Sequence, residues 1–114
     1  MRDAGERDTP IVFERFAAQT DAHGGEEEGY WQVYTRAWAA VRVGTGQERR
    51  EAGQTAAAQA ITLRVLANSL TTALTPLDRV ATYLGSTWDI AGVAVLDRAE
   101  IEITAVRRAE GQGR

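Results

Sequence analysis

The 114-residue sequence contains no cysteine and one histidine. Without cysteine, neither a disulfide framework nor a thiolate zinc site can form. No apolar run approaches the roughly 20 residues that a membrane-spanning helix needs, and the first residues lead into polar sequence rather than a signal-peptide core. We therefore expect a soluble protein that is made in the cytoplasm and does not contact a membrane.

Lysine is also absent, so all 13 basic residues are arginines; with 16 acidic residues they give a formal net charge of −3. A protein that grips phosphate backbones normally has a basic excess, because its affinity comes largely from counterion release around basic side chains. The charge balance therefore disfavours nucleic-acid binding. The length and the 44% hydrophobic composition predict one globular domain with its own core.

Six segments have the β-branched, aromatic and alternating composition of strands. They are residues 11–19, 30–43, 61–66 and three short strands within 78–103, which are separated by turns at Gly85-Ser86 and around 96–98. The length of segment 30–43 predicts a bulge or a bend. This pattern predicts a mainly β fold, either a small barrel or a sandwich of about six antiparallel strands.

The segments between these strands predict the domain organisation. Residues 1–9 are expected to form a flexible arm, residues 10–107 a single domain, and residues 108–114 a tail. Residues 20–29 have the composition of an exposed loop at the tip of a long hairpin. In the insertion 44–60, the Thr45–Glu48 segment fits a capping box that opens a short helix. The connection 68–77 is broken by Pro76 and is expected to contain one helical turn.

Large side chains indicate the core. Trp38 and Trp88 lie within apolar patterns and are predicted to lie inside, whereas Trp31 adjoins the polar loop and is predicted at a rim or an interface. Ile101 and Ile103 alternate with glutamates, which predicts inward isoleucines and outward glutamates.

Little in the sequence indicates an active site. His23 reads as an ordinary loop residue, and Glu26–Glu28 lack the spacing of a calcium loop, so a solvated acidic loop is favoured. Asp78, Asp89 and Asp97 flank predicted strand boundaries, where hydrogen bonds from the side chain to the backbone explain them. We predict no catalytic residue, no metal site and no cofactor.

The chain resembles the head-tail connector family, which comprises the adaptor and the head-closure or stopper proteins of long-tailed phages and gene transfer agents. The resemblance spans nearly the whole chain through these blocks in order: Ile11–Arg15, Asp21, Gly24-Gly25, Trp38–Arg42, Gly46–Arg49, Ala52–Gln59, Val65, Asp78–Val80, Tyr83–Gly85, Trp88–Ile90, Gly92-Val93, Asp97-Arg98 and Ile101–Ile103. Known members often start with a basic arm. Here acids at Asp3, Glu6 and Asp8 offset Arg2 and Arg7.

The resemblance implies a small β-barrel with a helical insertion that assembles as a homo-oligomeric ring of six or twelve subunits, six favoured. Such a ring sits in the neck of a virion or phage-like particle made in the bacterial cytoplasm. A portal-bound adaptor lies above it, and a tail terminator or tail tube protein lies below. Packaged DNA passes through without sequence-specific binding, and a loop closes or gates the channel. The resemblance implies no enzymatic activity.

Two sets of residues are candidates for this work. The candidate channel loop comprises Asp21, His23, Gly24, Gly25, Glu26, Glu27 and Glu28. The candidate subunit interface comprises Trp31, Glu48, Arg49, Arg50, Glu51, Gln54 and Gln59. Two other classes of function stay open from the residues alone: a barrel that stacks single-stranded nucleic acid on its tryptophans, and a small enzyme.

Overall fold

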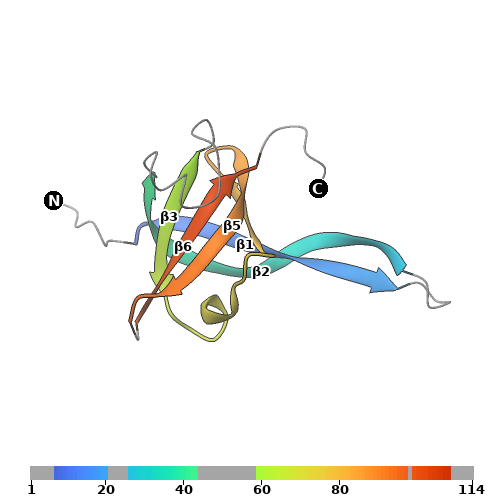
Figure 1. The fold of residues 1–114 in the computed structure, drawn as a ribbon, viewed down its shortest axis with the longest axis horizontal. Coiled ribbons are helices and arrows are strands. Elements are labelled where there is room, and N and C mark those ends of the chain that lie inside the picture. Colours follow the sequence, from blue (N-terminus) through green and yellow to red (C-terminus); the bar gives the residue numbers. More distant parts are fainter. Residues whose placement is uncertain (1–6, 21–25, 44–58, 98, 109–114) are drawn as a thin grey trace.

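A computed structural model describes residues 7–20, 26–43, 59–97 and 99–108, of which 19, 20 and 26–28 are described by their backbone alone. These residues form a closed barrel of antiparallel strands in the order β1-β2-β3-β6-β5-β4 (Figure 1). The elements are β1 (Thr9–Thr20), β2 (Glu26–Val43), β3 (Ala60–Leu66), the 3₁₀ helix η1 (Thr71–Ala73), β4 (Arg79–Tyr83), β5 (Ser86–Val95) and β6 (Glu100–Arg107). The predicted mainly β fold is confirmed as a six-stranded barrel.

The barrel interior is filled by alternate side chains of all six strands, as the period of two along a strand requires. Trp88 is the largest side chain that is fully buried, which confirms its predicted place in the core. Ile101 and Ile103 are also fully buried, as their alternation with glutamates predicts. Further members of the core are Ile11, Phe13, Ala39, Ile61, Leu63, Val65, Val80, Ile90 and Ala105.

The predicted place of Trp38 in the core is wrong, because its side chain is 60% exposed on the outer face of β2. Its neighbour Ala39 is fully buried, so the alternation of the strand turns Trp38 outward. Phe13 of β1 is also fully buried and belongs to the same core. Bulk alone favours a buried tryptophan, but the phase of the strand decides which face it takes.

The predicted helix of the insertion 44–60 lies almost wholly outside the described residues, which resume at Gln59. The helical turn expected in the connection 68–77 is confirmed as η1. β1 begins at Thr9, and Arg7 before it donates a 2.6 Å hydrogen bond to the Glu100 carboxylate. No helix in the described ranges is long and apolar enough to cross a membrane.

The hairpin of β1 and β2 projects beyond the barrel, and the molecule measures 57 × 33 × 22 Å along its principal axes (Figure 1). β1 pairs with β4 only through Phe13 and Glu14. Its pairing with β2 nevertheless continues to Thr20, opposite Glu26. Because six residues of β1 follow Glu14, at about 3.3 Å each, the projecting part is roughly 20 Å long.

Candidate functional site

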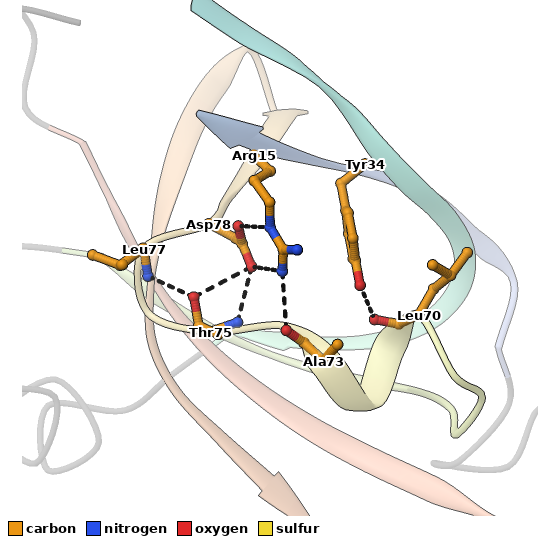
Figure 2. Close-up of polar contacts among 7 residues, drawn as sticks. All are labelled: Arg15, Tyr34, Leu70, Ala73, Thr75, Leu77 and Asp78. Carbon is orange, nitrogen blue, oxygen red and sulfur yellow. Dashed lines mark hydrogen bonds and ion pairs between the residues drawn. The ribbon is translucent and has the colours of Figure 1, made fainter. Parts of the chain in front are cut away.

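The root of the projecting hairpin contains a β-bulge. Phe13 pairs with Thr35 while the next residue, Glu14, pairs with Val33, so Tyr34 is an additional residue on β2. For the long second strand a bulge or a bend was predicted, and the structure has a bulge. A bulge bends its strand and increases the local twist, and it re-aims the side chain of the additional residue. Here it directs Tyr34 toward the connection between β3 and β4 (Figure 2).

An ion pair between a partly exposed arginine and a buried aspartate joins the hairpin to that connection. Arg15 of β1 donates two hydrogen bonds to Asp78, Nε to Oδ1 at 2.8 Å and Nη2 to Oδ2 at 3.0 Å (Figure 2). The Asp78 side chain is only 1% exposed, whereas Arg15 is 39% exposed. Oδ2 also accepts the backbone N–H of Thr75 at 2.9 Å. Arg15 thus balances the charge of the buried carboxylate, and hydrogen bonds satisfy its oxygens, as burial of a charge requires.

Arg15 and Tyr34 extend this contact along the connection. Arg15 Nη2 donates to the carbonyl of Ala73 at 3.0 Å, and the Tyr34 hydroxyl donates to the carbonyl of Leu70 at 2.8 Å (Figure 2). The Arg15 guanidinium lies 3.9 Å from the centre of the Tyr34 ring, in a cation–π contact. The hydrogen bond to Asp78 raises the pKa of Arg15 above its already high ordinary value, so the guanidinium stays charged at any physiological pH.

The connection is itself rigidly folded. Asn68 Oδ1 accepts the backbone N–H groups of Leu70 and Thr71, each at 2.8 Å, which opens the η1 turn. Thr71 is fully buried, and its hydroxyl donates to the carbonyl of Leu66 at 2.8 Å. The hairpin root therefore packs against a connection that is held in place by its own hydrogen bonds.

On the other face of the hairpin root, an aromatic pair of the hairpin lies against arginines of the barrel. The rings of Phe16 and Trp31 meet edge to face at 5.4 Å between centroids. The Arg79 guanidinium of β4 lies 4.0 Å from the Trp31 ring centre, and that of Arg108 lies 5.8 Å from it. Trp31 Nε1 is buried with no hydrogen-bond partner among the described residues, so stacking is what holds the indole.

Carboxylates fix both of these arginines. Arg79 Nε donates to Glu14 Oε1 at 2.8 Å, and the two side chains are only 16% and 19% exposed. Arg108 Nη2 donates to Asp89 Oδ1 at 2.5 Å. Each positive charge over Trp31 is thus matched by a carboxylate of a neighbouring strand, and the hairpin root is clamped on both faces.

Gly29 allows β2 to lie close to the Phe16 ring and to the backbone of Ala17 in β1. A Cβ atom at this position would lie 2.3 Å from the carbonyl oxygen of Ala17 and 2.7 Å from the Phe16 ring. Both distances are shorter than real contacts, and one involves backbone that cannot rotate away. Only glycine fits here.

The structure describes only part of the predicted site. Of the candidate channel loop, residues 21–25 lie outside the described residues, and Glu26–Glu28 form the start of β2. Of the candidate interface, residues 48–54 also lie outside. Trp31 is half-buried against its own chain, and exposed Gln59 accepts a 2.7 Å hydrogen bond from Arg107 through Oε1. Whether these residues contact DNA or another subunit stays a prediction.

Sequence reasoning missed the residues that clamp the hairpin. Arg15, Tyr34, Arg79 and Arg108 lie far apart in the sequence from their partners, so no local spacing joins them. Only part of the role of Asp78 was predicted. Its side chain accepts a hydrogen bond from the backbone N–H of Thr75, as predicted for aspartates at strand boundaries.

The other two predicted turn aspartates differ in their positions. Asp97 Oδ1 accepts the backbone N–H groups of Ala99 and Glu100, as predicted for a turn. Asp89 instead lies within β5, where it pairs with Arg108. Among the described residues, no three histidines or acidic side chains come together as a metal-binding group.

Comparison with known proteins gives fold neighbours and a family. A protein of Shigella flexneri 2a, whose structure was solved in solution, is similar with a TM-score of 0.71 and 19% sequence identity, over 96% of this chain and 99% of that one. A chain from the virion of a native gene transfer agent particle is similar with a TM-score of 0.60 and 24% identity, over 90% of this chain and 96% of that one. No curated protein matches the sequence.

At this level of identity the two structures establish the fold alone. The family comes from the sequence itself, because the model of the phage head completion proteins matches residues 2–108, which include every strand of the barrel and both faces of the hairpin root. The chain therefore belongs to the phage head completion protein family.

Proposed function

We propose that this structural virion protein forms a homo-oligomeric ring, most simply of six copies, between the portal-adaptor complex of the head and the tail. The ring joins head to tail, and the tips of the β1–β2 hairpins line and gate the channel through which packaged DNA passes. A portal-bound adaptor would lie on one side of the ring, and a tail terminator or tail tube protein on the other.

The observation that carries this proposal is the projecting hairpin with a clamped root. A gate element must reach away from its subunit and still hold its direction against the passing DNA. The Arg15–Asp78 pair holds one face of the root, and the stack of Trp31 on Arg79 holds the other. A hairpin that is braced at its root and projects beyond the barrel suits a channel loop.

The pairing of arginines supports passage of DNA rather than its capture. Five arginines in the described residues form salt bridges with carboxylates of the same chain: Arg7, Arg15, Arg64, Arg79 and Arg108. Guanidinium groups engaged in this way have less charge to offer a phosphate backbone. Acidic side chains at the start of β2 would repel DNA and let it slide.

The test is the triple substitution of Glu26, Glu27 and Glu28 by glutamine. We expect an unchanged melting temperature, because these residues lie at the outer end of the hairpin, together with slower DNA release or altered DNA retention by assembled particles. The control is Glu102→Gln, which removes a carboxylate from the barrel wall and should leave DNA release unchanged. Triple-variant particles that retain and release DNA like the wild type would contradict the gating role.

A further inference from the structure

Part of the outer wall of the barrel is buried. In β3 the side chains of Ile61, Leu63 and Val65 fill the interior, so the alternation of the strand turns Ala60 and Thr62 outward. An outward side chain lies outside the core, and its burial therefore needs a separate cause. Ala60 is only 1% exposed, and Thr62 is only 7% exposed.

The strands on either side of β3 also have buried outward side chains. Val106 of β6 pairs with Ala60 and is 5% exposed, and Ala40 of β2 pairs with the outward Arg64 and is 8% exposed. Cross-strand partners point to the same face of a sheet, so both side chains lie on the outer wall. The three apolar side chains Ala40, Ala60 and Val106 are buried without belonging to the interior core cluster. A cover on the outside of the barrel accounts for their burial.

The burial of the outer wall decreases from β3 toward β5. Thr104 of β6 lies directly opposite Thr62, next to it on the wall, yet it is only half-buried. Ala94 of β5, which pairs with Glu102 of β6, is exposed. The same residue types thus differ in burial across the wall, which shows that their size is not the cause. The cover lies mainly over β2 and β3, and β3 and β6 run side by side beneath it (Figure 1).

Residues 44–58 join the two strands that are covered most. β2 ends at Val43, which pairs with Ile61 of β3, so this segment leaves and returns at one end of the covered wall. The return is fixed, because the Arg107 N–H donates to the Gln59 carbonyl at 2.9 Å and its guanidinium donates to Gln59 Oε1 at 2.7 Å. At about 3.3 Å per residue, a segment of this length reaches roughly 25 Å out and back, whereas the covered part of β3 is roughly 13 Å long.

The composition of the segment suits the wall. Residues 44–58 contain four alanines, three glycines and no large apolar side chain. The side chains of the wall are small as well, so backbone and small side chains can approach it closely. The charged residues of the segment lie together at 48–51, which leaves the rest of it for contact with the barrel.

The other segments outside the described residues are joined to the barrel elsewhere. Residues 21–25 connect the strands at the far end of the hairpin. Arg7, which follows the first segment, is bound to Glu100 at the opposite end of β6 from the buried Val106. At Arg108 the chain runs along β5, since the Arg108 N–H donates to the Thr87 carbonyl at 2.8 Å.

We propose that residues 44–58 dock on the covered wall, formed by Ala40, Ala60, Thr62 and Val106, of their own subunit. The inference does not depend on the proposed ring. It implies that the covered wall is not a contact surface for other subunits. A partner that approaches this side of the barrel meets the insertion first, with its candidate interface residues 48–54.

Because the chain has no native cysteine, disulfide trapping in the purified full-length protein tests the contact. Thr62→Cys is combined with one cysteine at each position of 44–58 in turn, and dilute protein is oxidised and separated on a non-reducing gel. We expect internal disulfides at one or more positions, seen as a monomer whose mobility changes and is restored by reduction. The matched control is the same series with Ala94→Cys, which lies on the exposed part of the wall and should give none.

Maleimide labelling of single cysteines measures the cover itself. In the folded protein Thr62→Cys should react at least about tenfold more slowly than Ala94→Cys, because it reacts only when the cover opens. In urea the two variants should react at the same rate. Equal rates in the folded protein, or no internal disulfide at any position of 44–58, would overturn the proposal. Cross-linked dimers in place of internal disulfides would also overturn it, because the cover would then come from another copy.

Discussion

At the scale of single residues, a few positions decide the geometry of the hairpin, and their signals in the sequence differ. Tyr34 occupies the additional position of a bulge that the length of its strand predicts. Arg15 and Asp78 meet across 63 positions of sequence, which no local pattern encodes. The size of Trp38 suggested a place in the core. Its side chain points outward, because side chains alternate along the strand and the neighbouring Ala39 is the one that points into the core.

Gly29→Ala should destabilise the protein, because its Cβ would overlap the Ala17 carbonyl and the Phe16 ring. We expect a loss of about 2–3 kcal/mol in the free energy of unfolding, typical of an overpacked site that must shift backbone. Urea unfolding measures it. Gly92→Ala is the control, since no atom lies within 4 Å of its Cβ position, and it should change stability by less than about 0.5 kcal/mol.

Asp78→Ala should also destabilise, because it leaves the guanidinium of Arg15 and the N–H of Thr75 without their acceptor. We expect a loss of about 2–3 kcal/mol, at the low end for a buried pair because Arg15 is partly solvated. Asp97→Ala is a comparison at an exposed turn and should lose about 1 kcal/mol or less. Equal losses for the two variants would contradict a special role for the Asp78 clamp.

At the scale of elements, the strands were predicted well where apolar residues alternate, and less well where the hairpin continues past the barrel. The second strand was expected from residue 30 but begins at Glu26, in a polar glutamate run. Glutamate has a weak preference for strands, but pairing with β1 holds these residues in one. Pairing between strands is not visible in the local composition. The predicted hairpin itself is present, and both its faces are braced.

The Phe16–Trp31 contact should couple the two strands at the root. A double-mutant cycle with Phe16→Leu and Trp31→Leu should give an interaction free energy of about 0.5–1.5 kcal/mol, as for an edge-to-face aromatic pair. The cycle of Phe16→Leu with Tyr30→Leu, which lies on the opposite face of β2, should give less than about 0.3 kcal/mol. No coupling in the first cycle would show that the ring contact does not brace the hairpin.

At the scale of the whole molecule, the closed barrel could be predicted because six short strands with regular turns have few compact arrangements. The barrel rather than the sandwich came from the family resemblance, which the match over residues 2–108 confirms. Predictions for the insertion 44–60 concern residues that lie almost wholly outside those described. In the part of the chain that the structure describes, a hairpin projects from the compact barrel because Thr20 pairs with Glu26 far beyond the last contact with β4.

The whole molecule should bind DNA weakly. Its net charge is −3, and five described arginines are engaged in salt bridges. In gel-shift titration we expect no saturation below about 10 μM protein at 150 mM salt. Tight binding with a steep dependence on salt would favour the alternative of a nucleic-acid-binding barrel.

Electron cryo-microscopy of complete particles, with this protein identified in the density, is the decisive test of the proposed ring. We expect a closed ring of copies between the head and the tail, with the β1–β2 hairpins directed toward the DNA channel and the barrels forming the wall. Single copies without a ring, a ring elsewhere in the particle, or hairpins that point away from the channel would contradict it.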